Sequence, residues 1–187
     1  MSPETAPRMR ADALRNRARL VAEARAAFGE VDDSSEVPME AIAKRAGVGI
    51  GTLYRHFPAR TDLMEAVYSE HVEDLRTAAE KLVADLPPFE ALAAWLKVLL
   101  DSASVKRAIV TELVASIGRD SEFMTTNKQV MRDTCSTLVA AAQEAGTVRA
   151  DVAGPDVLSL VSGCTMMHLE GEQAERVLRV VVDGLRA

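Results

Sequence analysis

The sequence predicts an all-α protein, and three observations support this. The chain of 187 residues is 48% hydrophobic but only 4% aromatic, and it is rich in Ala, Leu, Glu and Arg, which favour helices. Apolar residues recur at helical spacing, whereas the alternation typical of a half-buried strand is scarce. Gly and Pro residues interrupt the pattern where helices should end. We expect about nine helices, with a three-helix part in residues 10–59 and a larger helical part in residues 60–187.

The N-terminal end predicts a tail followed by a long helix. Residues 1–9 contain two prolines and no apolar periodicity, so we expect them to be flexible. The first long helix is expected over residues 11–28, where Leu14, Val21 and Phe28 repeat at seven-residue intervals. This spacing predicts one buried face.

Two short helices joined by a glycine turn are predicted in residues 39–57. Gly47 stands where the first helix should end, and a glycine there can take the left-handed conformation that closes a helix. Gly49 can serve as the N-cap of the second helix. Leu53 and Phe57 are four residues apart, so they share a face that should point into the protein.

The other side of that second helix carries residue types that contact DNA. At about 100° per residue, Gly51 and Arg55 face outward, with Thr52 and Tyr54 on the flanks. The glycine permits close backbone approach, the hydroxyls can bond phosphate oxygens, and Arg55 can pair with guanine or with a phosphate. A helix–turn–helix also occurs in proteins that never bind DNA. The combination of compatible residues favours DNA binding. It includes His56, whose ring can donate a hydrogen bond to a phosphate.

The residues around this turn also match a known pattern, carried by residues 46–48 (AGV), residues 51–57 (GTLYRHF) and Leu63. The pattern resembles the signature of TetR-family transcriptional regulators and covers roughly the N-terminal third of the chain. The resemblance implies a three-helix DNA-binding domain followed by a larger helical domain that dimerises and binds a small molecule. It departs from the family at Gly49, which replaces the usual Ser or Thr cap, and in the acidic segment 29–38.

The resemblance also implies roles for individual residues. It places Thr52, Tyr54 and His56 at positions that contact DNA, mainly its backbone. Arg60 stands where the family usually has a lysine that pairs with phosphate, at the start of the next helix, whose free N–H groups also favour an anion. The positions expected to read the operator sequence are Ile50, Gly51 and Arg55.

The charge distribution is compatible with a DNA contact at one end only. The net charge is −6, but residues 1–60 carry +2 and the remainder carries −8. Local positive charge governs phosphate contact, because exposed charges beyond about 10 Å are largely screened. The acidic remainder should orient the N-terminal end toward the duplex.

The larger part predicts six more helices, divided by Pro87-Pro88, Gly118, Gly146 and Gly154-Pro155. Their expected ranges are 60–83, 89–102, 105–117, 121–145, 156–168 and 172–185. Candidate linings of an apolar ligand pocket are Trp95, Leu99, Phe123, Met124, Met131, Cys135, Met166, Met167 and His168. Met and Trp at helical spacing are more often plain core, and core is the favoured alternative for any single one of these side chains.

The last two helices predict a homodimer, because the final helix is apolar around much of its circumference. The expected interface residues are Leu158, Val161, Val177, Leu178, Val181 and Leu185. A buried terminal helix in a monomer is the alternative. A two-fold dimer would place two recognition helices roughly 34 Å apart, on the half-sites of a palindromic operator.

The sequence therefore favours a repressor that leaves its double-stranded operator when a small apolar or amphipathic ligand binds. An activator of the same family and a DNA-independent ligand-binding protein remain alternatives. An enzyme is disfavoured, because the three histidines are scattered without catalytic spacing. No cofactor or metal is expected, since Cys135 and Cys164 are isolated and predict buried free thiols. Without a signal peptide or an apolar run of ~20 residues, we expect a cytoplasmic protein with no membrane partner.

Overall fold

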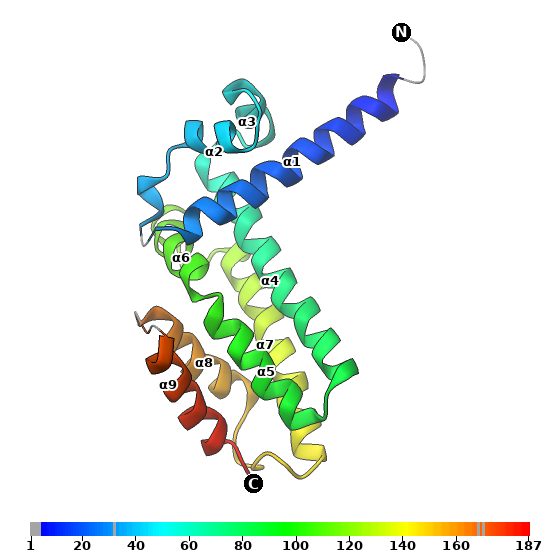
Figure 1. The fold of residues 1–187 in the computed structure, drawn as a ribbon, viewed down its shortest axis with the longest axis vertical. Coiled ribbons are helices and arrows are strands. Elements are labelled where there is room, and N and C mark those ends of the chain that lie inside the picture. The colour runs from blue at the N-terminus through cyan, green and yellow to red at the C-terminus, as the bar shows by residue number, and fades with distance from the viewer. Residues whose placement is uncertain (1–4, 32, 168, 170) are drawn as a thin grey trace.

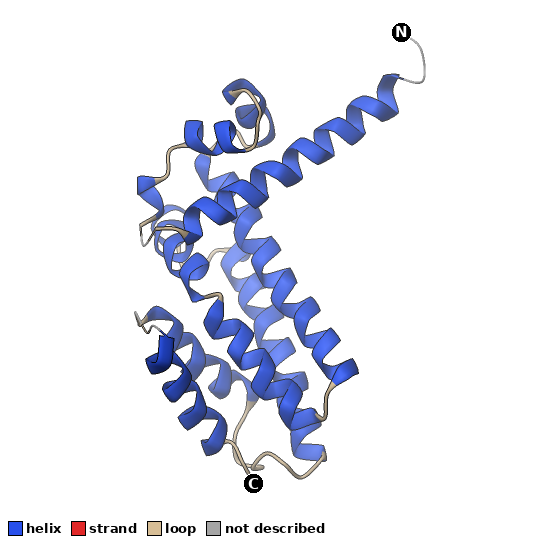
Figure 2. Ribbon diagram, in the orientation of Figure 1, coloured by secondary structure: helices blue, strands red, loops and turns tan. Residues whose placement is uncertain are grey.

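The computed structural model describes residues 5–31, 33–167, 169 and 171–187, and every regular element among them is a helix (Figure 1, Figure 2). The all-α prediction is confirmed. The helices are α1 (Thr5–Gly29), η1 (Ser34–Glu36), α2 (Met39–Arg45), α3 (Ile50–His56), α4 (Arg60–Asp85), α5 (Pro88–Asp101), α6 (Ala103–Ile117), α7 (Glu122–Glu144), α8 (Gly154–Met166) and α9 (Gly171–Gly184).

Helix α1 begins at Thr5, so residues 5–9 are helical rather than part of a tail, while residues 1–4 lie outside the described chain. Its apolar stripe is buried only in the C-terminal half. Val21 and Phe28 are buried, but Leu14 is 69% exposed, and the prediction that it faces the core is wrong. The reason is that the N-terminal half of α1 projects beyond the other helices (Figure 1).

Two hydrophobic cores lie one above the other in the elongated molecule. The first is formed by α1, α2, α3, the start of α4, and three residues of α6: Ala108, Ile109 and Leu113. The second is formed by the rest of α4 with α5, α7 and α8, and it is closed at one end by Leu185. Helix α4 therefore runs through both cores, and α6 contributes to the core of the N-terminal part.

The expected division between residues 59 and 60 falls in the short connection between α3 and α4. The packing does not stop there. Leu63, Met64 and Val67 of α4 are buried in the first core, whereas Val72 and Leu75 of the same helix are buried in the second. The N-terminal three helices are thus completed by side chains from the larger part.

Helix α8 packs unusually close to α7 at its first residue. A Cβ atom on Gly154 would lie 2.5 Å from the Cα atom and 2.7 Å from the backbone N of Ser136. Only glycine allows this approach. Helix α8 begins at Gly154, two residues earlier than expected, with Pro155 in its first turn, where the missing N–H costs no hydrogen bond.

Helix α9 is amphipathic and lies on the outside of the second core. None of its residues within Gly171–Gly184 is fully buried, but Leu178, Val181 and Val182 pack partly against the core. No helix in the described ranges is long and apolar enough to cross a membrane. Those ranges also contain no group of three or more His, Cys, Asp or Glu side chains suited to holding a metal ion.

Candidate nucleic-acid interface and internal cavity

The α2–α3 turn has the geometry that its glycines predicted. Gly47 adopts a φ of 65°, in the left-handed region, and the next residue, Val48, donates its N–H to the Ala43 carbonyl at 3.0 Å. Gly49 is the extended N-cap of α3, and its carbonyl accepts the Thr52 N–H at 2.9 Å. One hydrogen bond closes the end of α2 and the other begins α3, so the turn between the two helices is short and well defined.

Helix α3 presents one apolar side and one open side. Leu53 is 0% exposed and Phe57 is 1% exposed, so both anchor the helix in the first core, as predicted. Gly51, Tyr54 and Arg55 are exposed on the other side. A Cβ on Gly51 would meet no atom within 4 Å, so the fold itself does not require glycine at this position.

The remaining expected contact residues of α3 lie at the edge of this open side. Ile50 is 38% exposed, and Thr52 and His56 are half-buried. The structure brings these side chains and the three exposed ones together on one short helix. A surface of this kind, with hydroxyls, a guanidinium and an open glycine on a protruding helix, fits the DNA major groove.

Polar contacts fix the helices behind α3. Arg45 at the end of α2 bonds both carboxylate oxygens of Glu30 at 2.8 Å and one of Glu23 at 3.3 Å. The Arg17 guanidinium of α1 lies 5.0 Å from the centre of the Phe57 ring, at the end of α3. These contacts tie α2 and α3 to α1.

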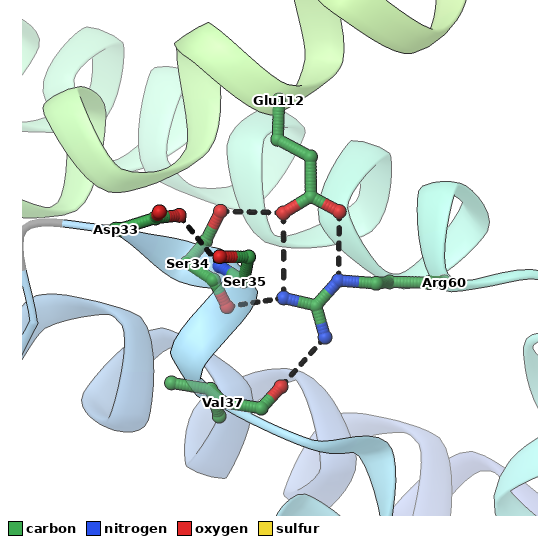
Figure 3. A network of polar contacts seen from close by, with 6 residues as sticks. All are labelled: Asp33, Ser34, Ser35, Val37, Arg60 and Glu112. Carbon is green, nitrogen blue, oxygen red and sulfur yellow. Dashed lines mark hydrogen bonds and ion pairs between the residues drawn. The ribbon is translucent and has the colours of Figure 1, made fainter.

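Arg60 is placed differently from the sequence expectation. Its guanidinium makes two bonds to Glu112 of α6, at 2.7 Å and 3.3 Å, and donates to the carbonyls of Val37, at 2.6 Å, and Ser34 (Figure 3). It also lies 5.4 Å from the centre of the Phe28 ring. The side chain is directed toward α6 and η1, and its N–H donors are engaged in bonds within the protein.

The start of α4 is also occupied by a carboxylate. Asp62 accepts the Ala59 N–H at 2.8 Å, which caps the helix and places a negative charge where a phosphate was expected. A phosphate at this helix end would meet that carboxylate. A phosphate was expected at the α4 N-terminus because of the Arg60 charge and the free N–H groups of the helix. Neither feature is available to a phosphate in the structure.

Glu112 is a functional candidate that sequence reasoning missed. Burial alone would raise the pKa of its carboxyl, but the bonds from Arg60 and Ser34 outweigh burial and lower it. Ser34 donates to the same carboxylate at 2.6 Å. Glu112 is 52 residues from Arg60 along the chain, and no local pattern joins two positions so far apart.

Comparisons with known proteins agree with this geometry over both parts of the chain. Residues 20–67 match the model for bacterial regulatory proteins of the tetR family. Residues 87–187, more than half of the chain, match the model for the C-terminal domain of SbtR-like transcriptional regulators. The chain belongs to the TetR family. Its members are bacterial regulatory proteins.

Solved TetR-family structures share the whole fold. A TetR regulator from Mycobacterium vanbaalenii is 38% identical with a TM-score of 0.76, over 96% of this chain and 99% of that one. A second, from Streptomyces coelicolor, is 34% identical with a TM-score of 0.75, over 91% of this chain and 98% of that one.

Matches to curated TetR-type relatives are shorter. An HTH-type regulator of Staphylococcus aureus is 41% identical over 54 residues, 29% of this chain and 28% of the relative. One of Mycobacterium bovis is 35% identical over 92 residues, 48% of this chain and 47% of the relative. The chain thus matches less than half the length of these relatives.

The larger part of this TetR-family chain contains a cavity of about 480 Å³ between α4, α5, α6, α7 and α8. Four of the residues expected at a ligand pocket line this cavity: Leu99, Met124, Met131 and Met166. Four other expected residues do not line it. Trp95 is 0% exposed and donates its indole N–H to the Leu75 carbonyl at 2.8 Å, as a core residue.

The other three lie in different surroundings. Cys135 is buried in the second core, where burial raises the pKa of its thiol to about 12. Phe123 packs against the first core and faces Tyr68, with ring centres 6.1 Å apart. Met167 is 57% exposed at the end of α8, and His168 lies outside the described residues.

Polar residues of the cavity were missed by the sequence analysis. The α4 side chains Tyr68 and His71 line it, as do Arg119, Lys128 and Arg132. The spacing of residues along α7 could have indicated that Lys128 lines the cavity. Lys128 is four residues after Met124 and three before Met131, so it shares a face of the helix with them.

The expected dimer residues divide into two groups. Leu158, Val161 and Leu185 are buried in the second core of the same chain. They are therefore not available to a dimer interface, and the prediction that they form one is wrong. The other three, Val177, Leu178 and Val181, are half-buried on α9. The large apolar side chains exposed on α8 and α9 are Leu160, at 55%, Met166, at 45%, and Val180, at 73%.

Proposed function

We propose that this TetR-family protein is a repressor that binds a palindromic operator as a homodimer and releases it when a small ligand enters the cavity. The observation that carries the proposal is the orientation of α3. Leu53 and Phe57 hold the helix in the core, while Gly51, Tyr54 and Arg55 remain exposed on one side. A helix held in this way can enter the major groove without disturbing the domain behind it.

Release by a ligand is supported by the two faces of α6. Val110 and Val114 line the cavity, whereas Ile109 and Leu113 are buried in the first core. Glu112, on the same helix, bonds Arg60 at the start of α4. A ligand that moves α6 would therefore act directly on the packing of the DNA-binding helices.

Helix α4 offers a second connection, because Tyr68, Val72 and Leu75 line the cavity and Leu63 lies in the first core. A ligand can shift the DNA-binding equilibrium only by its difference in affinity for the two states. The proposed repressor therefore holds the two recognition helices at operator spacing when empty and at another spacing when occupied.

The test is a fluorescence-anisotropy titration of the full chain onto DNA from upstream of its own gene, at several salt concentrations. We expect sequence-preferring binding that weakens as salt rises, because phosphate contacts release counterions. Arg55→Ala should weaken operator binding about tenfold, since a good base or phosphate contact contributes about 1–3 kcal/mol.

The matched control is Lys81→Ala. Lys81 is also an exposed cation, but it lies near the far end of α4 from α3. This variant should bind the operator like the parent protein. No sequence preference in the parent, or equal losses in the two variants, would contradict operator recognition by α3.

A further inference from the structure

The rim of the cavity is cationic. Lys128 and Arg132 are one turn apart on α7, and Arg119 lies in the connection between α6 and α7. No Asp or Glu is found among the residues that line this cavity in the described chain. The arrangement is unusual for this protein, because residues 61–187 carry a net charge of −8.

These three cations also lack the partners that other cations have. Within the described ranges, none of the three makes an ion pair or a side-chain hydrogen bond. In contrast, eight arginines elsewhere pair with a carboxylate. A cluster of like charges beside a cavity is unfavourable by itself and favours an anion.

Much of the rest of the cavity lining is apolar. Val72, Leu75 and Leu158 are almost fully buried and line it together with Leu99. Burying an apolar group against such side chains contributes roughly 25 cal/mol per Å² of area removed from water. The cavity thus offers one region suited to a hydrocarbon or aromatic body and another suited to a negative group.

We propose that the cavity binds an amphipathic anion, whose apolar body lies on Val72, Leu75 and Leu158. Its carboxylate, sulfonate or phosphate group is held by Arg119, Lys128 and Arg132. A neutral apolar molecule would leave the three cations uncompensated, and a cationic one would be repelled. The inference rests on the cavity being the effector site of the proposed repressor, but its binding step can be measured without DNA.

A matched pair of fluorescent probes tests the charge requirement. 8-Anilino-1-naphthalenesulfonate and N-phenyl-1-naphthylamine share the same aromatic body, and only the first carries a sulfonate. Titrated into the full chain, the anionic probe should bind at one site per protomer and at least about tenfold more tightly than the neutral probe.

Variants locate the anion. Arg132→Gln removes a half-buried cation and should lower the affinity for the anionic probe about tenfold. Lys128→Gln removes an exposed cation and should lower that affinity about threefold. The neutral probe should bind these variants and the parent alike. Lys81→Gln, with an exposed lysine far from the cavity, is the control and should alter neither affinity. Unchanged circular-dichroism melting shows that the variants are folded.

The results separate this inference from the proposed function. Equal affinities for the two probes, no binding of either, or an anionic affinity insensitive to Arg132→Gln and Lys128→Gln would each overturn the anion site, whatever the operator titration shows. Conversely, the expected probe results in a protein that binds no operator would support the anion site and contradict the repressor. Release of the operator by the anionic probe alone would support both.

Discussion

At the scale of single residues, Arg60 shows how completely one side chain can be committed to the fold. A guanidinium has five N–H donors in a rigid fork, which suits a carboxylate on one edge and carbonyls on the others. Glu112 takes one edge, the Val37 and Ser34 carbonyls take the rest, and the guanidinium lies over the Phe28 ring. The same side chain would have to give up these bonds to reach a phosphate.

Glu112→Gln should lower the free energy of unfolding by about 1–2 kcal/mol at pH 7, because it replaces a charge-assisted pair with a neutral one. The pKa of Glu112 is lowered in the folded protein, so its stabilisation is present above its ordinary pKa of 4.5 and is lost as the pH falls through the lowered value. Urea unfolding at several pH values measures both effects.

The variant and the parent should therefore differ in stability at pH 7, and the difference should shrink as the pH falls below 4.5 and through the lowered pKa of Glu112. Glu70→Gln is a suitable control, because Glu70 is an exposed carboxylate in the middle of α4. A constant difference between the Glu112 variant and the parent at all pH values would contradict an ionised Glu112 in the network.

At the scale of elements, the close crossing of α7 and α8 depends on the absence of a side chain. Gly154 lies against the backbone of Ser136, which cannot move aside as a flexible side chain would. The wall of the cavity formed by α8 is positioned by this contact. The cost of a larger residue there should appear in the stability of the whole second core.

Gly154→Ala should lower the free energy of unfolding by about 1–3 kcal/mol, because overpacking forces backbone shifts. Gly163→Ala, in the same helix, has no atom within 4 Å of the new Cβ and should stabilise the protein by up to about 1 kcal/mol. Thermal unfolding of both variants measures the difference. Equal changes in the two would contradict the close approach.

At the scale of the whole molecule, the proposed dimer has to form through the apolar surface that α8 and α9 leave exposed. Leu158, Val161 and Leu185 are already buried in their own chain, so the available apolar surface includes Leu160 and Val180. Such side chains on the last two helices favour contact with a second copy, because their burial would remove apolar surface from water.

Val180→Asp and Leu160→Asp, made together, should convert the dimer to a monomer, since two buried carboxylates on each side would be uncompensated. Sedimentation equilibrium measures the change, and operator affinity should fall with it. Val83→Asp changes an exposed valine of α4 in the same way and should leave the dimer intact. A dimer that survives the double substitution would exclude this surface.

The fold was largely predictable from the sequence, because helix ends and buried faces are local properties. Gly47 and Gly118 end helices as expected, and Leu53 and Phe57 are buried as their spacing predicted. Leu14 was mispredicted because periodicity cannot show where a long helix outruns its neighbours.

A candidate site was easier to predict when its residues lie close together in the sequence. The α3 surface lies within seven residues, and its outward side follows from helical geometry. The cavity combines five helices, and whether a residue such as Trp95 or Cys135 faces the cavity or the core depends on contacts across the chain. The Arg60–Glu112 pair depends on the same long-range packing.

The burial of Ala108, Ile109 and Leu113 among the N-terminal helices has a practical consequence for engineering. A fragment cut after α3 or α4 would expose apolar side chains that α6 covers in the full chain, and it would be prone to aggregation. A chimera meant to transfer the DNA-binding part to another ligand-binding domain therefore has to include α6 together with α1 to α4. The smallest stable DNA-binding unit is thus made of two segments that are not continuous in the sequence.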